Sequence, residues 1–194
     1  MEVLQTSALP LGYVAARSDR FYLRASPGPA APLGCGHLPD QDFRDVMARL
    51  PAGVVVVSSR LDGEYRGMTV SSLVSISLEP PMVLVGLERE SATRAAVLQA
   101  RAFNVSVLTR SQEFLADRLS GRAPAIDPSW STLPHHLGAN GIPLIDGCAA
   151  WLECRLDQVH EAGDHDLFVG HVESVAAGSG DPLVLWDRAF WTLR

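Results

Sequence analysis

Apolar and polar residues alternate over several short stretches of the chain, which is the period of a half-buried β-strand. The clearest case is 74–78, and after Pro80 and Pro81 a continuous apolar run over 82–87 has the length of a buried strand. Neither proline can donate to a strand ladder, so the pair must separate the two strands. Further strands are predicted over 53–59, 65–70, 103–108, 149–161, 165–176 and 182–191.

Apolar residues recur with helical spacing at only three places. Phe43, Val46, Met47 and Leu50 follow the i, i+3, i+4, i+7 pattern, so we expect an amphipathic helix capped by Asp40, ended by Pro51 and packed into the core by its apolar stripe. Short helices are also predicted from Ser91 to residue 100 and over 111–119. Few helices and about seven strands, without repeated strand–helix alternation, favour a closed or split antiparallel barrel over a doubly wound sheet.

Turn and loop signals divide the chain further. Asp62-Gly63 is typical of a hairpin turn, and residues 162–164 are expected to join the two long strands near the C-terminus. Residues 120–140 are rich in Gly, Pro, Ser, Asp and His, which predicts a long irregular loop. Residues 1–39 are rich in Pro and Gly and have no apolar periodicity, so we expect a partly disordered extension before one domain over 40–194.

Composition excludes several classes of protein. The chain is 47% hydrophobic with a net charge of −6, which argues against a nucleic-acid binder. All 16 basic residues are arginine, which excludes lysine Schiff-base chemistry and a phosphate-loop lysine. No apolar segment has the length of a membrane span, and residues 1–39 lack the pattern of a secretory signal. The expectation is a cytoplasmic protein that binds neither nucleic acid nor membrane.

Cysteine and histidine do not form a recognisable metal or disulfide pattern. Cys35, Cys148 and Cys154 are too few and too irregularly spaced for a disulfide framework or a zinc ribbon, so idle thiols are expected. His135 and His136 are adjacent and would point to opposite faces of a strand. We therefore predict no metal site.

Five hydroxyl groups gather between residues 67 and 81, and they are the strongest candidate for a ligand site. Each can both donate and accept a hydrogen bond, and apolar residues alternate with them. The five are Thr69, Ser71, Ser72, Ser75 and Ser77. By composition alone, a serine-rich strand edge is the favoured interpretation of this stretch.

The start of the second predicted helix is a candidate anion site. A helix N-terminus presents unpaired N–H groups and the positive end of the helix dipole. Ser91 is a good N-cap, Thr93 adds a hydroxyl in the first turn, and Arg89 and Arg94 flank it. Taken alone, an ordinary capped surface helix is the simpler interpretation.

With these motifs in their order, the chain resembles the short-chain flavin reductases, which have an FMN-binding split-barrel fold. The resemblance runs from about Asp42 to the C-terminus. It rests on five stretches: 43–57, 67–81, 89–93, 103–108 and 163–172. The expected fold is thus a mainly β, antiparallel Greek-key split barrel with a few short helices. The C-terminal segment departs from the family, which often has tyrosines where 185–190 reads Leu-Trp-Asp-Arg-Ala-Phe.

The resemblance also implies a site. Flavin contacts are implied at Met68, Thr69, Val70, Ser71, Ser72 and Ser75, and around Glu88, Arg89, Ser91 and Thr93, with Asn104 as a further ligand contact. His165, between Asp164 and Asp166, is implied beside the nicotinamide of NADH or NADPH.

The implied function is NAD(P)H-dependent reduction of FMN or FAD. The chain has no Gly-x-Gly-x-x-Gly turn after a strand, so the nicotinamide nucleotide must be held without a Rossmann unit. Hydride transfer needs two rings held face to face more than acid–base help. A homodimer is implied, and free reduced flavin would pass to a partner monooxygenase, in secondary metabolism or aromatic hydroxylation.

Two other functions stay open at the level of the sequence. Related split-barrel proteins keep FMN tightly bound and act as electron carriers or oxidases. A non-enzymatic module that binds haem or flavin would use His160 or His171 as a ligand. Flavin that survives dialysis would favour the first, and a Soret absorption band the second.

Overall fold

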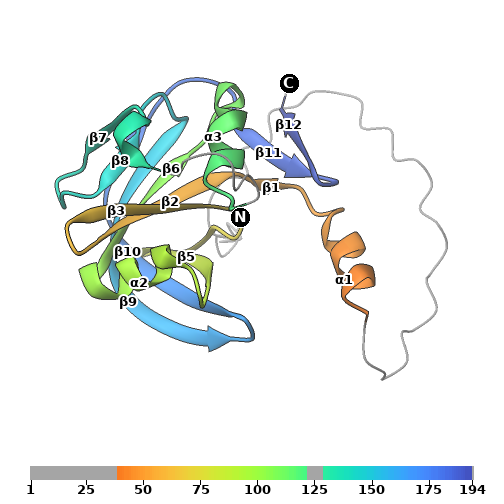
Figure 1. The fold of residues 1–194 in the computed structure, drawn as a ribbon, viewed down its shortest axis with the longest axis horizontal. Coiled ribbons are helices and arrows are strands. Elements are labelled where there is room, and N and C mark those ends of the chain that lie inside the picture. Colours follow the sequence, from red (N-terminus) through yellow and green to blue (C-terminus); the bar gives the residue numbers. More distant parts are fainter. Residues whose placement is uncertain (1–38, 122–128, 194) are drawn as a thin grey trace, which may run out of the picture.

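The computed structural model describes residues 39–121 and 129–193, which fold into a mainly β domain (Figure 1). Its main element is an antiparallel sheet of seven strands in the order β3-β2-β6-β9-β10-β5-β4. These strands are β2 (Val55–Leu61), β3 (Glu64–Val70), β4 (Val74–Leu78), β5 (Pro81–Glu88), β6 (Ala102–Val107), β9 (Ala150–Ala162) and β10 (His165–Ala177). The prediction of a mainly β antiparallel fold is confirmed. In the described part of the chain no pairing joins the edge strands β3 and β4, so a closed barrel is not formed by hydrogen bonds.

Strand β2 lies at the centre of the domain because both of its faces are buried. Val55 and Val57 belong to one hydrophobic cluster, and Val54 and Val56 belong to another on the opposite face. Alternate residues of a strand point to opposite faces, so a run of valines supplies both cores at once.

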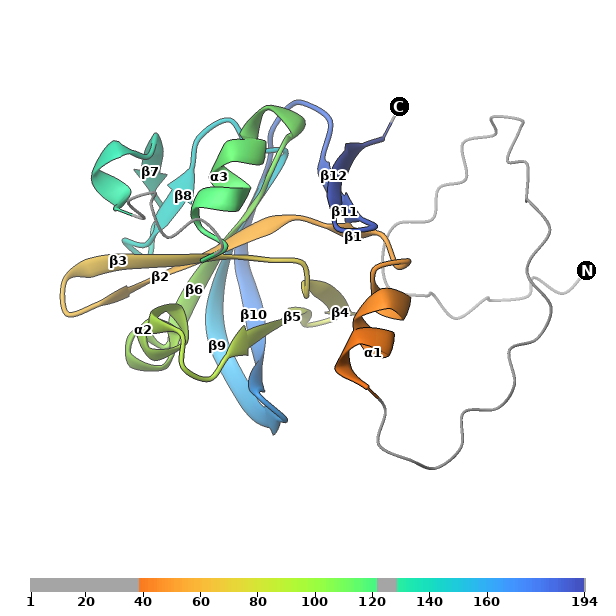
Figure 2. The ribbon, with the colours of Figure 1, turned by 45° about the vertical axis from the view of Figure 1, so that its right-hand side comes forward.

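The first cluster lies inside the curl of the sheet. It brings Val57 of β2 against Val85 of β5 and Phe168 of β10, although β2 and β5 lie far apart in the strand order. Figure 2 shows the sheet bending so that these strands face each other. Helix α2 (Ala92–Ala100) buries Val97 in the same cluster.

The second cluster is covered by the remaining short elements. A three-stranded sheet contains β1 (Ala52–Gly53), β11 (Leu183–Trp186) and β12 (Ala189–Thr192), and a two-stranded sheet contains β7 (His135–Leu137) and β8 (Pro143–Ile145). Helix α3 (Glu113–Arg118) and the 3₁₀ turns η1 (Arg110–Gln112) and η2 (Trp130–Thr132) complete this layer. The prediction that 120–140 is irregular throughout is wrong, because η2 and β7 lie within it. Trp130 is buried there, and its packing orders the segment.

Several local predictions are confirmed. Asp62 and Gly63 both have positive φ and form the turn between β2 and β3, as the hairpin prediction requires. Strand β4 ends at Leu78, before the two prolines. The predicted extension over 1–39 lies, apart from residue 39, outside the described residues.

Helix α1 (Asp40–Met47) differs from its prediction in two ways. Its apolar stripe is exposed: Phe43, Val46 and Leu50 keep 55%, 69% and 61% of their surface accessible. The helix begins at Asp40 itself, with Pro39 as N-cap residue, so Asp40 is not the cap. Helical periodicity identifies an apolar face but not what covers it.

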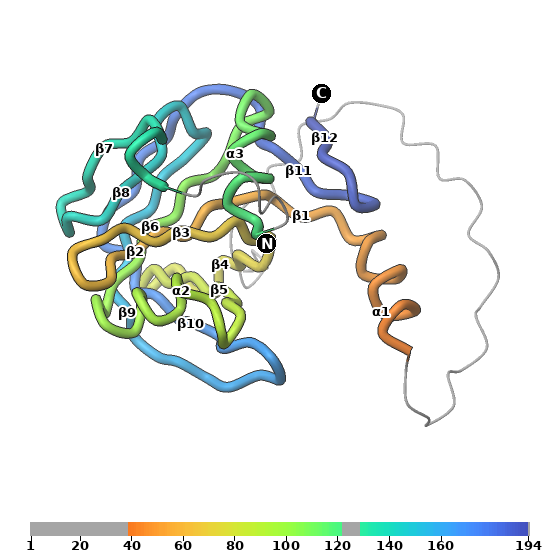
Figure 3. Tube along the Cα trace, viewed as in Figure 1, coloured from red at the N-terminus to blue at the C-terminus, as the bar shows by residue number. Residues whose placement is uncertain are grey.

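Polar contacts with the β11–β12 turn hold α1 in place instead. Figure 3 shows α1 beside this hairpin, away from the main sheet. Asp45 pairs with Arg188 and Arg49 with Asp187, and the Asp187 N–H donates to the Ala48 carbonyl at 2.8 Å. Asp187 and Arg188 both have positive φ, an uncommon conformation for non-glycine residues.

Candidate functional site

A cleft lies between α1 and the end of β3. It has a volume of about 830 Å³, within the usual range of 300 to 1,000 Å³ for ligand pockets. Its walls are formed by α1, the segment after β3 and the β11–β12 hairpin. The lining residues include Phe43, Arg44, Met47, Ser71, Ser72, Val74 and Trp186.

A second hollow continues from this cleft along β3. It is lined by Met68, Thr69, Val70, Ser71 and Glu88, and it shares Ser71 and Leu185 with the larger cleft. The structure therefore places six of the sequence-predicted residues, 68–72 and Glu88, on two adjoining hollows, which together are called the depression below.

The predicted hydroxyl groups differ in their hydrogen-bond partners and in their exposure. The Thr69 hydroxyl donates to the Ala116 carbonyl at 2.8 Å, which ties β3 to α3. Ser71 is exposed and lines both hollows. Ser75, another predicted site residue, lines neither hollow; its hydroxyl is buried and has no hydrogen-bond partner among the described residues.

Ser72 connects the cleft to His165. Its hydroxyl donates to the Gly86 carbonyl at 3.0 Å and accepts from the Gly86 N–H at 3.1 Å. A Cβ at position 86 would lie 3.5 Å from the Ser72 hydroxyl and 3.8 Å from Cδ2 of His165. Ser72 and His165 therefore flank the same glycine of β5.

His165 is the first residue of β10 and is paired with Glu88 across β5. Its side chain is 41% exposed, and its Nδ1 lies 2.8 Å from the Asp164 carboxylate. This hydrogen bond, followed by the charge of His165, lowers the pKa of Asp164 below its ordinary value, and Arg44 of α1 lowers it further. The imidazole is thus held by its neighbour with one edge open to solvent.

The predicted phosphate-binding arginines are paired with acidic residues. Asp166 is 2% exposed, and its two carboxylate oxygens lie 3.1 Å from Arg89 and 2.6 Å from Arg94. Arg89 also lies 2.9 Å from Glu161. Two positive and two negative charges balance in this cluster.

The hydroxyls at the start of α2 are similarly engaged. Ser91 is the N-cap, as predicted: it accepts from the Arg94 N–H at 3.2 Å and donates to the Glu88 carbonyl at 2.8 Å. Thr93 is buried at 3% exposure against the sheet. The phosphate role of these residues stays a prediction.

Asn104 is buried within the sheet. Its amide donates to the Ile142 carbonyl at 2.9 Å, and its carbonyl accepts from Asn140 at 2.7 Å. It lines neither part of the depression. These contacts give Asn104 a structural role in holding the loop before β8, and its predicted ligand contact stays untested.

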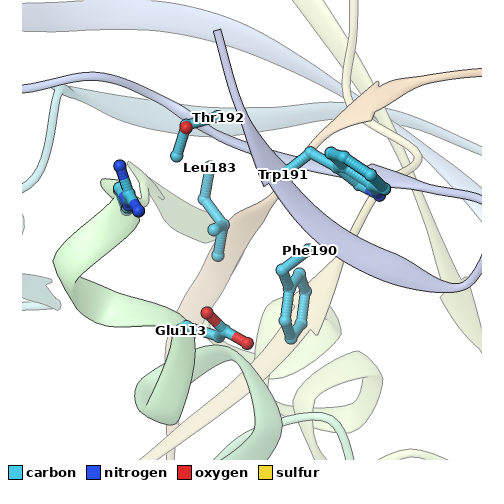
Figure 4. A pocket seen from close by; sticks show the side chains of 6 residues that line it. Glu113, Leu183, Phe190, Trp191 and Thr192 are labelled. Carbon is cyan, nitrogen blue, oxygen red and sulfur yellow. The ribbon is translucent and has the colours of Figure 1, made fainter.

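Another hollow, of about 480 Å³, lies on the far side of Phe190 (Figure 4). Glu113, Leu183 and Thr192 line it with Phe190 and Trp191. Phe190 also lines the hollow beside Thr69, so its ring faces both spaces. Apart from Phe190, no residue of this hollow belongs to the depression, and none was predicted as a site residue.

The histidines and cysteines that were considered as metal ligands or reactive groups have ordinary structural surroundings. In the described part of the chain no group of three His, Cys, Asp or Glu residues has the arrangement of a metal site. His135 packs edge-on against Trp130, and His136 lies 2.7 Å from Asp146. Cys148 and Cys154 are buried free thiols, and burial raises the pKa of each to about 12. Cys35 lies outside the described residues.

No helix in the described ranges is both long and apolar enough to cross a membrane.

Comparison with known proteins identifies the family of this chain. The family described as "Flavin reductase like domain" matches residues 47–194. The chain belongs to this flavin reductase-like family. It is 36% identical over 149 residues to a flavin reductase from Pseudomonas putida, a match that covers 76% of this chain and 86% of the relative.

Other members of the flavin reductase-like family have a similar sequence identity to this chain. The reductase component of 4-hydroxyphenylacetate 3-monooxygenase from Thermus thermophilus is 35% identical over 153 residues, covering 76% of this chain and 93% of that protein. The solved structure of the NADH:FAD oxidoreductase SgcE6 from Streptomyces globisporus matches with a TM-score of 0.75 at 32% identity. That match covers 86% of this chain and 99% of the other.

Of the residues that line the cleft in this flavin reductase-like chain, only Ser71 and Ser72 were predicted as site residues, and Arg44 is among those that sequence reasoning missed. Arg44 was not predicted as a site residue because its position follows from the docking of α1 on the β11–β12 turn. No local signal reports a contact between segments so distant in the sequence. Asp166 was noted only as a neighbour of His165, and its pairing with Arg89 and Arg94 depends on the meeting of β10 with α2.

Proposed function

We propose that the protein is an NAD(P)H-dependent flavin reductase that transfers hydride to FMN or FAD and releases reduced flavin to a partner monooxygenase. The observation that carries this proposal is the depression lined by 68–72, with His165 beside the same glycine as Ser72. Relatives named as NADH:FAD oxidoreductase and as a monooxygenase reductase component support it.

The residues present fit a flavin. The cleft has the volume of a ligand pocket, and its walls combine apolar side chains such as Val74 and Trp186 with the free hydroxyl of Ser71. Bound flavin would supply the ring atom that accepts hydride. No side chain in the depression is required as an acid or base for that step.

This chain contributes the relative position of the two reactants. Ser71 and the backbone of 68–70 would hold the flavin ring and its ribityl chain, with Glu88 at the same wall. Ser72 fixes the β3–β4 connection to β5 and thereby sets where that wall lies. His165 would orient the nicotinamide nucleotide with its open edge, while Asp164 holds Nδ1. Correct orientation of two reactants alone can lower a barrier by roughly 7 to 11 kcal/mol.

We also propose that the functional unit is a homodimer. Exposed apolar residues on α1 and on β4, including Val46, Val74 and Leu78, support this proposal. Neighbouring apolar side chains left open to water are typical of a protein–protein surface.

The experiment that tests the proposed function measures NADH and NADPH oxidation at 340 nm with dialysed protein, without flavin and with FMN or FAD. We expect oxidation only when flavin is added, with saturation by the preferred flavin. His165→Ala should raise the KM for NADH. Absence of oxidation with either flavin and either nucleotide would refute the proposed function, and activity without added flavin would indicate a bound prosthetic group.

A further inference from the structure

The cleft between α1 and β3 contains one arginine that is not neutralised. Three charged residues line it: Arg44, Asp187 and Arg188. Asp187 pairs with Arg49, and Arg188 pairs with Asp45. Across the described ranges, the structure shows no ion pair or side-chain hydrogen bond for Arg44.

The arginines predicted from sequence to hold a phosphate do not supply net charge. Arg89 and Arg94 share the buried carboxylate of Asp166, and Arg89 also pairs with Glu161. An anion at the start of α2 would therefore meet a balanced cluster rather than two free guanidinium groups. Within the cleft, the arginine that has no ion-pair partner among the described residues is Arg44 of α1, while the smaller hollow carries the carboxylates of Glu88 and Asp117.

The position of Arg44 is fixed by the contacts of its helix. Asp45, Ala48 and Arg49 all bond to the β11–β12 turn, so α1 presents Arg44 to the cleft that Ser71 and Ser72 line from the other side. Arg44 also lies within electrostatic reach of Asp164, the residue beside His165. Arg44 thus lines the same cleft as Ser71 and Ser72, on the side from which its charge also acts on Asp164.

We infer that Arg44 is a binding residue for a phosphate group of a nucleotide in this cleft, either of the flavin or of the nicotinamide nucleotide. A guanidinium binds phosphate oxygens through paired, charge-assisted hydrogen bonds, and it stays charged at any working pH. This inference rests on the proposed function, since it requires that a nucleotide occupies the depression.

The test measures equilibrium binding rather than turnover. Dissociation constants are determined by isothermal titration calorimetry for riboflavin, FMN, FAD and NAD⁺, with the full chain of the unchanged protein, Arg44→Gln and Arg44→Lys. Arg155→Gln, on β9 and paired with Glu173, removes the same charge elsewhere and serves as the control. Circular dichroism and the thermal midpoint show whether each variant is folded.

We expect Arg44→Gln to weaken the binding of a phosphate-bearing ligand by about tenfold and to leave riboflavin binding unchanged, because one charge-assisted contact is lost. Arg44→Lys should restore most of the affinity, and Arg155→Gln should have no effect. Weakening of FMN and FAD identifies a flavin phosphate as the partner, and weakening of NAD⁺ alone identifies the nicotinamide nucleotide. The affected ligand should also lose affinity with added salt more steeply in the unchanged protein than in Arg44→Gln.

Two results would overturn the inference: unchanged affinity for all ligands in Arg44→Gln, or an equal loss for riboflavin and FMN, which would show that the cleft itself had changed. Failure of the proposed function is distinguishable. It would appear as no binding of any flavin by the unchanged protein, whereas failure of this inference alone leaves the unchanged protein able to bind.

Discussion

At the scale of single residues, Gly86 of β5 is the position that Ser72 and His165 share. The Ser72 hydroxyl donates to the Gly86 carbonyl and accepts from the Gly86 N–H. A Cβ at Gly86 would meet both side chains at ordinary van der Waals distances, so the two hydrogen bonds to the backbone, rather than the missing side chain, hold Ser72 beside β5.

The titration of Asp164 provides a test of the His165 contact. Its pKa is lowered in the folded protein, so the carboxylate stabilises the fold above its ordinary pKa of 3.8, and that contribution is lost as pH falls through the lowered value. We predict that His165→Ala moves the pKa of Asp164 up toward 3.8. Carbon-detected NMR of the carboxyl groups measures this shift.

Asp45 is the internal control for that titration. Its pKa is lowered chiefly by the hydrogen bond from Arg188, so it should not change in His165→Ala. A pKa of Asp164 that is the same in both proteins would show that the imidazole does not hold the carboxylate in solution.

Gly170 is a glycine with a specific packing role. A Cβ there would clash with the ring of Phe103, because it would lie closer to the ring than van der Waals contact allows, and Phe103 is fully buried. We predict that Gly170→Ala lowers the free energy of unfolding by about 1 to 3 kcal/mol, the usual cost of overpacking. Urea denaturation measures this. Gly53→Ala, which adds a methyl where nothing lies within 4 Å, should change stability far less.

At the scale of elements, the sequence is informative wherever a signal is local. The strands follow from alternation, the β2–β3 hairpin follows from Asp62-Gly63, and the start of α2 follows from Ser91. Each depends on residues a few positions apart. The docking of α1 could not be predicted, because its partner turn lies near the other end of the chain.

The cap of α2 is directly testable. Ser91→Ala removes the acceptor of the Arg94 N–H, and we predict a loss of about 1 kcal/mol in the free energy of unfolding. Ser91→Asp keeps an acceptor at the cap and should retain most of the stability. Equal unfolding midpoints for all three proteins would contradict the role of Ser91 as a cap.

At the scale of the whole molecule, the sequence predicted the fold class, but not how the candidate residues are charged. The flavin contacts that the resemblance implies at 68–72 stay a prediction, and the structure shows these residues lining two adjoining hollows. The resemblance also pointed to Arg89, and the helix-start pattern added Arg94, but Asp166 and Glu161 balance their charges. Ion pairs between distant segments exist only after folding, so their net charge has no signature in a single stretch of sequence.

The exposed stripe of α1 bears on the assembly of the molecule. If the proposed homodimer uses this surface, a charge at Val46 must be buried on association, and that is costly. We predict that the unchanged protein sediments as a dimer and that Val46→Glu sediments as a monomer in analytical ultracentrifugation. Ser179→Glu, which adds the same charge at an exposed residue outside α1 and β4, should leave the dimer intact. A monomeric unchanged protein would refute the homodimer.

The attachment of α1 has a consequence for how the cleft responds to its surroundings. Two exposed ion pairs and a few hydrogen bonds hold one wall, while the opposite wall belongs to the segment that joins β3 and β4 of the seven-stranded sheet. Exposed pairs contribute at most about 1 kcal/mol each, and ions in solution screen them, over roughly 10 Å at 0.1 M and 3 Å at 1 M. The width of the cleft is therefore sensitive to ionic strength on one side only: a concentrated salt solution loosens the helical wall and leaves the sheet wall in place.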